Sequence, residues 1–346
     1  MQKKIVFLRL NPNATGGAEH YLLRLKEALS QAKTASSIRR YSGKKWLSSW
    51  IKALIFNAQA RRAKANDELY FSLERIDSAD IYRAGDGVHK IYRQSKKLWW
   101  LNPLNFVYPY LEKRCFNNAK IIIANSNFIA RQITEAYGIS REKISVIYNG
   151  VKIPSAVDKM GSKKALCDEL GLDSELPILL FVGSGFKRKG VSELLFISKA
   201  LNELKFKHNL IIIGKDKRLK SYEKMANKLE VKAKFMGERK DVARFYEASE
   251  AFIFPTLYEP FSNVILEALS YGCISLSTTQ NGASEILPKE WVLSADSLND
   301  ARLIIKALSE NKAQEAQEIA AKYTIEKNAL QTLSLINDVL KANMLK

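Results

Sequence analysis

Short runs of β-branched and aliphatic residues alternate with longer amphipathic stretches along almost the whole chain. This alternation is typical of α/β units, in which each strand of a parallel sheet is followed by a helix that covers the sheet. The expected strands are residues 4–10, 121–125 and 144–148 in the first half, and residues 178–182, 210–213, 233–236 and 251–254 in the second half. The helix after the first strand is expected over residues 17–33. We therefore predict an α/β protein with two open parallel sheets.

A turn separates the two series of strands. Asn149-Gly150 is a turn signal, Pro154 follows, and residues 155–165 are polar, so we place a domain boundary close to residues 150–160. The chain of 346 residues also exceeds what one hydrophobic core usually organises. Residues 301–346 show helical periodicity and no strand pattern, so the chain is expected to finish in helices.

Positive charge is concentrated in the first half. Residues 1–150 carry 26 Lys and Arg against 11 Asp and Glu, whereas the rest of the chain carries 29 against 25. Much of the excess lies beside Trp and Tyr in residues 39–52 and 89–100. Such a pattern suits an anionic membrane surface, where each Lys or Arg contributes about 1 kcal/mol, and a solvated basic face explains it equally well. No nucleic-acid-binding motif is present, so nucleic acid is not an expected partner.

The apolar runs and the cysteines point to a reducing, aqueous compartment. No run approaches the roughly 20 apolar residues that cross a bilayer, and the pattern of residues 1–10 is that of a strand rather than a signal peptide. Cys115, Cys167 and Cys273 lie far apart and lack metal-ligand spacing, so we expect reduced thiols and no metal site. The sequence predicts a cytoplasmic protein.

Four segments that follow expected strands carry candidate ligand-binding residues, since open α/β sheets bind ligands at that edge. In the first segment, Gly16 and Gly17 can bring backbone N–H groups to an anion. The second, VGSGFKRKG over residues 182–190, contains Gly183 and presents cations in a tight turn suited to a diphosphate. Val191 stands where a P-loop requires lysine, which excludes a P-loop ATPase. A solvated basic loop is the alternative for this segment.

The third segment, GERKD over residues 237–241, is by itself an ordinary charged turn. The fourth, YEPFSNVILEAL over residues 258–269, predicts a loop followed by a helix. Pro260 disfavours helix at Glu259, while Ser262 or Asn263 can cap a helix whose first turn exposes backbone N–H groups. Glu267 then lies on that helix among apolar residues, where a carboxylate without a partner costs several kcal/mol. Ligand hydroxyls can supply the partner, and an exposed strip of the helix is the alternative.

Glu259 and Glu267 are separated by seven residues and match the E-x7-E motif of retaining glycosyltransferases of family 4. The GGAEH turn, the basic turn ending in Arg188-Lys189-Gly190, the GERKDV loop and the order of the segments resemble the same family over essentially the whole chain. Within it, VGSGFKRKGV, IIIGKDK and GERKDV are most similar to the lipopolysaccharide core glucosyltransferases that add glucose to a heptose.

The resemblance implies the GT-B fold, an α/β architecture of two Rossmann-like domains that face each other across a cleft. Residues 1–153 would bind the acceptor, and residues 154–322 would bind the nucleotide sugar. Residues 323–346 would form a C-terminal helix that packs back on the first domain.

The resemblance also implies roles for individual residues. Arg188 and Lys189 would bind the donor diphosphate and neutralise the departing nucleotide, Glu267 would hold the ribose hydroxyls, and Glu259 would hold hydroxyls of the donor sugar. Arg239 would lie near the nucleobase. Further donor contacts, mainly through backbone N–H groups, would come from Gly16, Gly17, Gly183, Phe261, Ser262, Asn263 and Val264.

Two positions depart from the family pattern. Many relatives carry Arg directly after the Val-Gly of the phosphate turn, where this chain has Ser184, so the charge would come from Arg188 and Lys189 alone. Many also carry a histidine near the sugar in the first domain. In this chain Asp86 matches the glucosyltransferase subgroup and would steer or deprotonate the acceptor hydroxyl as a catalytic residue, with His89 as the alternative.

The expected activity is a metal-independent hexosyl transfer with retention of configuration. The resemblance implies front-face attack, with the leaving phosphate helping to take the acceptor proton, so that Glu259 is a donor ligand rather than a nucleophile. We expect UDP-glucose as the donor and a saccharide or glycolipid of the lipopolysaccharide or lipooligosaccharide inner core as the acceptor, on the inner face of the cytoplasmic membrane. The alternatives are a sugar-nucleotide epimerase of the same fold and a non-catalytic binder of anionic surfaces.

Overall fold

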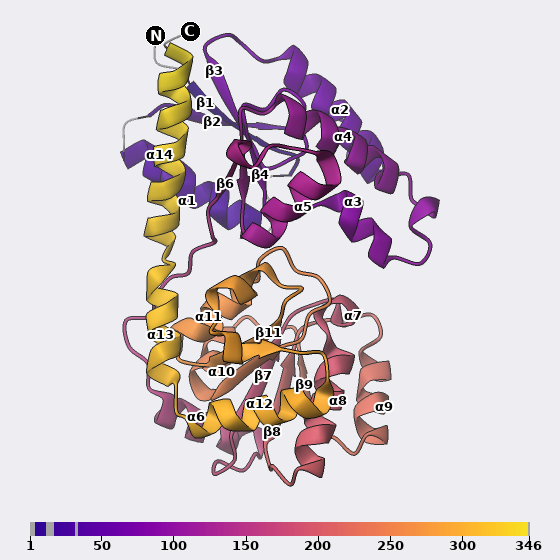
Figure 1. Ribbon diagram of the computed structural model, residues 1–346, viewed down its shortest axis with the longest axis vertical. Coiled ribbons are helices and arrows are strands. Elements are labelled where there is room, and N and C mark those ends of the chain that lie inside the picture. Colours follow the sequence, from indigo (N-terminus) through magenta and orange to yellow (C-terminus); the bar gives the residue numbers. More distant parts are fainter. Residues whose placement is uncertain (1–3, 12–16, 32–33, 345–346) are drawn as a thin grey trace. The chain divides into compact units, whose positions relative to one another are not determined.

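The computed structural model describes residues 4–11, 17–31 and 34–344. Its contacts divide the chain into two compact units: the first contains Met1–Tyr148 and Glu326–Lys346, and the second contains Asn149–Ile325. These breaks lie a few residues from the boundaries at 153 and 322 that the sequence suggested. In each unit, helices pack on a six-stranded sheet whose neighbouring strands are all parallel (Figure 1).

The sheet of the first unit has the strand order β2-β1-β3-β4-β5-β6. Its strands are β1 (Lys4–Arg9), β2 (Ser36–Arg40), β3 (Glu68–Ser72), β4 (Ile81–Ala84), β5 (Ile121–Ala124) and β6 (Ile144–Val146). The helices of this unit are α1 (Gly17–Gln31), α2 (Ser49–Arg62), α3 (His89–Tyr92), α4 (Leu104–Asn118), α5 (Asn127–Tyr137) and the later α14 (Ile325–Met344), with single 3₁₀ turns at Arg93–Ser95, Trp99–Leu101 and Arg141–Lys143. The expected strands at 4–10, 121–125 and 144–148 correspond to β1, β5 and β6.

The core of the first unit lies on both faces of its sheet. Ile5 and Phe7 of β1 point to one face and pack in a cluster with α1 and α14. Val6 and Leu8 point to the other face and pack with Phe56 of α2. Because both faces are covered, β1 is apolar at successive positions, as strands of parallel sheets usually are.

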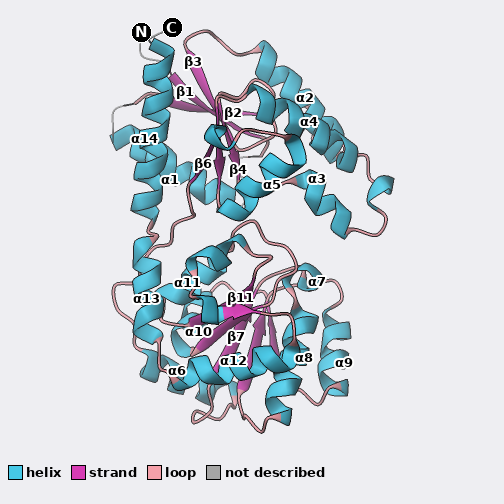
Figure 2. Ribbon diagram, in the orientation of Figure 1, coloured by secondary structure: helices cyan, strands magenta, loops and turns pink. Residues whose placement is uncertain are grey.

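The sheet of the second unit has the order β12-β11-β10-β7-β8-β9. Its strands are β7 (Ile178–Val182), β8 (Asn209–Ile213), β9 (Ala233–Gly237), β10 (Ala251–Phe254), β11 (Ile274–Thr278) and β12 (Val292–Leu293). The helices are α6 (Lys159–Leu170), α7 (Phe186–Lys189), α8 (Val191–Glu203), α9 (Leu219–Lys228), α10 (Val242–Ala248), α11 (Asn263–Ser270), α12 (Ser297–Ser309) and α13 (Ala313–Lys322), with 3₁₀ turns at Gly282–Ile286 and Lys289–Trp291. The four strands predicted in this half of the chain are confirmed (Figure 2).

The last helix, α14, returns to the first unit, as the sequence suggested. Its Ile336 and Val339 belong to the same buried cluster as Ile5 and Phe7. The Thr332 and Tyr21 hydroxyls lie 3.2 Å apart in the interior and form a hydrogen bond between α14 and α1. The final helix is therefore part of the core of the first unit.

Candidate functional site

The turn between β7 and α8 is held against the segment that follows β10. Gly190 has a φ of +83°, and a Cβ atom there would lie 1.9 Å from the carbonyl oxygen of Pro255. The Arg188 carbonyl accepts hydrogen bonds from the Thr256 hydroxyl at 3.0 Å and from the Leu257 N–H at 2.9 Å. The basic turn and the loop that carries Glu259 are thus fixed to one another at the carboxyl ends of neighbouring strands.

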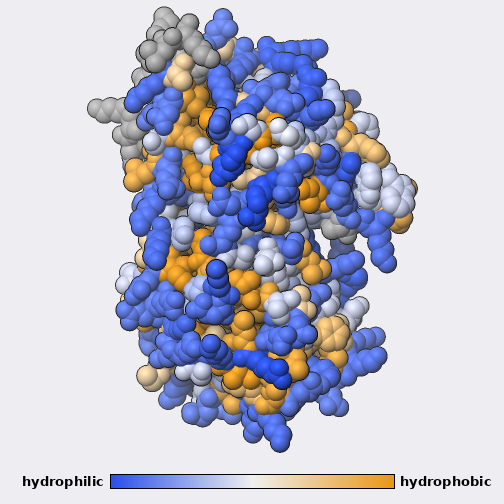
Figure 3. Space-filling model, in the orientation of Figure 1, coloured by the Kyte–Doolittle hydropathy of each residue, from blue (hydrophilic) through white to orange (hydrophobic). Residues whose placement is uncertain are grey.

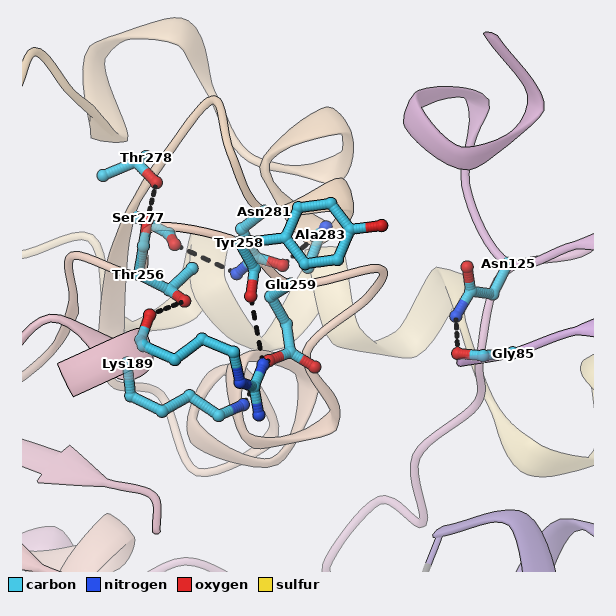
Figure 4. Close-up of polar contacts among 11 residues, drawn as sticks. Gly85, Asn125, Lys189, Thr256, Tyr258, Glu259, Ser277, Thr278, Asn281 and Ala283 are labelled. Carbon is cyan, nitrogen blue, oxygen red and sulfur yellow. Dashed lines mark hydrogen bonds and ion pairs between the residues drawn. The ribbon is translucent and has the colours of Figure 1, made fainter. Parts of the chain in front are cut away.

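Arg188, Lys189 and Glu259 form an ion cluster in this place. Arg188 Nη1 donates to Glu259 Oε2 at 2.6 Å and to the Tyr258 carbonyl at 3.0 Å. The Lys189 ammonium binds the same carboxylate oxygen (Figure 4). The side chains of Lys189 and Glu259 are only 13% and 14% exposed. Burial lowers the pKa of Lys189 below its usual value, and the Glu259 carboxylate opposes that shift.

The backbone of Glu259 is paired with a third segment, which follows β11. Its N–H donates to the Gln280 carbonyl, and its carbonyl accepts from the Gly282 N–H, both at 2.9 Å. The buried Asn281 stiffens that segment, since its side chain donates to the Ser277 hydroxyl and accepts from the Ala283 N–H (Figure 4). The sequence analysis did not identify Asn281, because an Asn-Gly pair such as Asn281-Gly282 indicates only a turn.

Ser262 occupies the N-cap position of α11, one of the two expected positions, but its side chain makes no capping hydrogen bond. Its hydroxyl oxygen is buried without a partner among the described residues. The Ser262 hydroxyl accepts no hydrogen bond from the first-turn N–H groups. Those N–H groups can therefore donate to an anion at the N-terminus of the helix. Next to it, Phe261 is buried, Val264 is half-buried, and Asn263 is exposed and accepts a hydrogen bond from the Asn149 side chain at 2.7 Å.

Glu267 lies on α11, as predicted, and is half-buried. Its Oε2 accepts a hydrogen bond from the Tyr246 hydroxyl at 3.1 Å. Burial and the neighbouring carboxylate raise the pKa of Tyr246 well above 10, so that hydroxyl remains a donor. A protein partner for Glu267 therefore exists within the second unit.

The remaining residues expected at the donor site are less closely tied to the cluster. Arg239 pairs with Asp241 through two hydrogen bonds of 2.9 and 2.6 Å, and this contact lowers the pKa of Asp241. The Gly183 N–H donates to the Ile213 carbonyl at 2.9 Å. Gly17 is the first residue of α1, and Gly16 lies outside the described residues.

In the first unit, Asp86 and His89 lie in different environments. Asp86 follows β4 and is exposed. The preceding Gly85 carbonyl accepts a hydrogen bond of 3.1 Å from the Asn125 side chain at the end of β5 (Figure 4). His89 is buried, its Nε2 lies 2.8 Å from Asn105 Oδ1, and burial lowers its pKa. The geometry favours Asp86 over His89 for contact with a substrate.

A buried ion pair anchors the segment that carries Asp86. Glu112 of α4 has no exposed surface and accepts hydrogen bonds from Arg75 Nε at 2.9 Å, from the His89 N–H at 2.7 Å and from the Lys90 N–H at 3.2 Å. Sequence reasoning missed Glu112 and Arg75, since neither residue belongs to a motif. Their contacts tie the start of α3, three residues after Asp86, to α4.

Comparison with protein families decides where this chain belongs. Residues 162–327 match the family described as glycosyl transferases group 1, and residues 82–153 match the family described as Glycosyltransferase Family 4. The chain belongs to the family 4 glycosyltransferases. The ion cluster, Glu259 and Glu267 all lie inside the first of these matches.

Curated relatives of this family 4 glycosyltransferase include the lipopolysaccharide glucosyltransferase WaaG of Escherichia coli K12. It is 26% identical over 219 residues, which are 60% of this chain and 58% of the relative. An uncharacterised protein from the cps region of Klebsiella pneumoniae is 29% identical over 181 residues, 52% of this chain and 49% of that protein. The chain matches about half the length of these curated relatives.

Solved structures resemble the family 4 chain over nearly its full length. The crystal structure of WaaG has a TM-score of 0.76 at 18% identity and covers 96% of this chain and 99% of its own. HepE of Anabaena, in complex with UDP and glucose, has a TM-score of 0.72 at 18% identity, with coverages of 97% and 99%. At such identities the similarity shows the fold, which is the GT-B fold that the sequence predicted.

Neither a metal-binding cluster nor a membrane-spanning helix is present among the described residues. Within residues 4–11, 17–31 and 34–344, no group of three His, Cys, Asp or Glu side chains is placed to hold a metal ion. In the same part of the chain, no helix is both long enough and apolar enough to cross a bilayer. Metal independence stays a prediction from the family resemblance.

Proposed function

We propose that this family 4 glycosyltransferase moves a hexose from a nucleotide sugar to a saccharide acceptor with retention of configuration. The observation that carries the proposal is the cluster of Arg188, Lys189 and Glu259 at the carboxyl ends of β7 and β10. Two cations in a half-buried position stabilise the negative charge that develops on a leaving diphosphate more strongly than they would in water. The leaving phosphate itself then helps to accept the proton of the acceptor hydroxyl, and no protein nucleophile is needed.

The donor would bind in the second unit. Glu267 would hold the ribose hydroxyls and keep Tyr246 as its second partner. The backbone N–H groups from Phe261 to Val264 would meet the phosphates, and Arg239 would lie near the base. UDP-glucose is the proposed donor because WaaG is named a glucosyltransferase and HepE was crystallised in complex with UDP-glucose.

The acceptor would bind in the first unit at the carboxyl edge of its sheet. Asp86 is exposed there on an anchored loop and would orient or deprotonate the acceptor hydroxyl. The proposed acceptor is a saccharide of the lipopolysaccharide or lipooligosaccharide inner core. The support for it comes from two relatives named for lipopolysaccharide synthesis, WaaG and LpsE of Rhizobium meliloti.

A membrane-facing segment would bring the enzyme to such an acceptor. Five apolar or aromatic side chains between α3 and the middle of α4 are more than half exposed, namely Leu98, Trp100, Leu101, Phe106 and Tyr110. Lys96, Lys97 and Lys113 are exposed beside them. Exposed apolar and aromatic groups with lysines nearby in the sequence fit a membrane interface with anionic lipids. On the face drawn in Figure 3, hydrophilic residues cover most of the surface and hydrophobic ones form scattered patches. We propose peripheral attachment to the cytoplasmic face of the membrane.

The donor half of the proposal is tested by calorimetric titration with UDP-, ADP- and GDP-sugars. The wild type should bind one of them, and Glu267→Ala and the Arg188→Ala, Lys189→Ala double variant should lose that binding. Release of the free nucleoside diphosphate when lipopolysaccharide core saccharide is added as the acceptor identifies a transferase. Conversion of the sugar without release of UDP would identify an epimerase, and absence of nucleotide binding would leave only a binder of anionic surfaces.

The membrane half is tested by flotation with vesicles of phosphatidylcholine containing phosphatidylglycerol. The Trp100→Ser, Leu101→Ser variant should float less than the wild type, and added salt should weaken flotation of both. Leu330→Ser, which removes an equally exposed apolar side chain from α14, is the matched control and should float like the wild type. Equal flotation of all three proteins would exclude the segment as the membrane contact.

A further inference from the structure

Glu259 partly neutralises the two cations that the proposed donor site offers to a diphosphate. One oxygen of its carboxylate, Oε2, binds both Arg188 Nη1 and Lys189 Nζ. The N–H and the carbonyl of Glu259 are both bonded to the segment after β11, so rotation of the side chain alone can take the carboxylate away from the cations while the backbone stays held. The cluster carries a net charge of one positive unit where two cations stand.

A diphosphate needs the same two cations. Charge-assisted hydrogen bonds from Arg and Lys to phosphate oxygens are the strong interactions of such sites. The Glu259 carboxylate would then lie next to phosphate oxygens of like charge, in surroundings where charges are poorly screened. The carboxylate and the diphosphate therefore compete for Arg188 and Lys189.

We propose that Glu259 is an exchangeable counter-ion that favours the nucleotide sugar over the free nucleotide. A diphosphate displaces the carboxylate from Arg188 and Lys189, and the hydroxyls of the donor sugar supply its new hydrogen bonds. Bound UDP has no sugar and leaves the carboxylate beside the phosphates without those partners. Glu259 thus weakens the binding of the product and promotes its release. This inference rests on the proposed function, because it assumes that a sugar diphosphate binds here.

The alternative role for Glu259 is purely structural. If Glu259 only held Arg188 and Lys189 in the geometry that phosphate needs, removal of its charge would weaken the binding of every diphosphate. If a diphosphate displaces the Glu259 carboxylate, UDP should instead bind Glu259→Gln more tightly than the wild type. The neutral amide of Gln releases the two cations and does not repel the phosphates. The sign of one change in affinity therefore separates the two roles.

The test is calorimetric titration of the wild type and Glu259→Gln with UDP, UDP-glucose and uridine. We expect UDP to bind Glu259→Gln about tenfold more tightly than the wild type, which is about 1.4 kcal/mol. UDP-glucose should bind with equal or lower affinity than it binds the wild type. Uridine has no phosphate, so its affinity should not change.

Two controls separate charge from folding. Glu290→Gln removes a carboxylate from another ion pair of the second unit, with Lys312, and should leave all three affinities unchanged. Glu259→Asp keeps the charge, so it should not reproduce the tighter binding of UDP. Equal or weaker binding of UDP to a folded Glu259→Gln protein overturns the inference and leaves the proposed function standing. A wild type that binds none of the three ligands overturns both.

Discussion

At the scale of single residues, Lys189 carries a charge in a position where burial works against it. In the proposed donor site Lys189 binds the diphosphate in its protonated form, and burial places the pKa of Lys189 below the usual 10.5 of a lysine. The affinity for UDP-glucose should therefore fall as the pH rises through that lowered pKa. Lys189→Arg keeps its charge at every pH in this range, so its affinity should change less. Titrations between about pH 7 and about pH 10 test this, and parallel profiles of the two proteins would assign the pH dependence to another group.

Replacement of Asp86 should lower activity, whereas replacement of His89 should lower stability. Asp86→Asn should lower the rate of transfer roughly 10²- to 10⁴-fold, the range for loss of a general base, with an unchanged affinity for UDP-glucose. His89→Gln should destabilise the protein because the buried ring and its bond to Asn105 are lost. The folded fraction of that variant should keep its rate of transfer. The measurement is the rate of UDP release in the presence of acceptor saccharide, normalised to the amount of folded protein. Loss of transfer in folded His89→Gln would assign the acceptor role to His89 instead of Asp86.

At the scale of elements, the close approach of the turn before α8 to the end of β10 makes Gly190 sensitive to substitution. Gly190→Ala adds a Cβ atom 1.9 Å from the Pro255 carbonyl oxygen, so one of the two segments must shift. It should lower the free energy of unfolding by more than about 2 kcal/mol, beyond the roughly 1–2 kcal/mol of a left-handed conformation alone, and should weaken donor binding.

The control for that change is Gly171→Ala. Gly171 also has a positive φ, of +60°, but a Cβ atom there would meet nothing within 4 Å. Its cost should stay near 1 kcal/mol, and donor binding should be unaffected. Urea denaturation and calorimetric titration measure both quantities, and equal losses in the two variants would show that the contact with Pro255 carries no extra cost.

Strands that form a continuous apolar run could be predicted, and the strands missing from the prediction carry polar residues or are very short. β7 and β10 are continuous apolar runs, because helices cover both sides of their sheet. β2 at one edge of the first sheet reads SSIRR and is mostly half-exposed, so its sequence carries no apolar pattern. β12 at an edge of the second sheet has only two residues. β11 lies inside the second sheet and is buried throughout, but Ser275, Ser277 and Thr278 break its apolar run. Sequence patterns therefore report apolar character, and a buried strand with polar residues leaves no clear pattern.

The residues of the candidate site also divide into those that could be predicted from the sequence and those that could not. Glu259, Glu267 and the basic turn could be found because each lies in a short segment whose local pattern is unusual. Glu112 could not, because its burial depends on Arg75, which is 37 residues earlier in the chain, and on the backbone of His89. Within α4, Glu112 begins the charged run Glu-Lys-Arg, which a solvated helix face would also show. Contacts between distant segments set the role of such a residue, and one sequence does not record them.

At the scale of the whole molecule, the chain enters the second unit at Asn149 and leaves it at Ile325, so the first unit is completed only by the last helix. Most of the excess positive charge and the proposed membrane segment belong to this unit. The proposed donor residues other than Gly16 and Gly17 belong to the second unit, which is continuous in sequence. The two units therefore have different requirements for folding, although one chain builds both.

Removal of α14 should unfold the first unit and spare donor binding. A chain that ends at Ile325 lacks Ile336, Val339 and the Thr332 partner of Tyr21, and their loss exposes the core around Ile5 and Phe7. Hydrogen exchange should then become fast in residues 4–148 and stay slow in β7 and β10, while UDP still binds. Ile336→Asp, which places a charge at a fully buried position of the intact chain, should have the same effect. Leu330→Asp on the exposed side of α14 is the matched control and should change neither exchange nor binding. Loss of UDP binding together with the first unit would mean that the donor site needs residues from that unit.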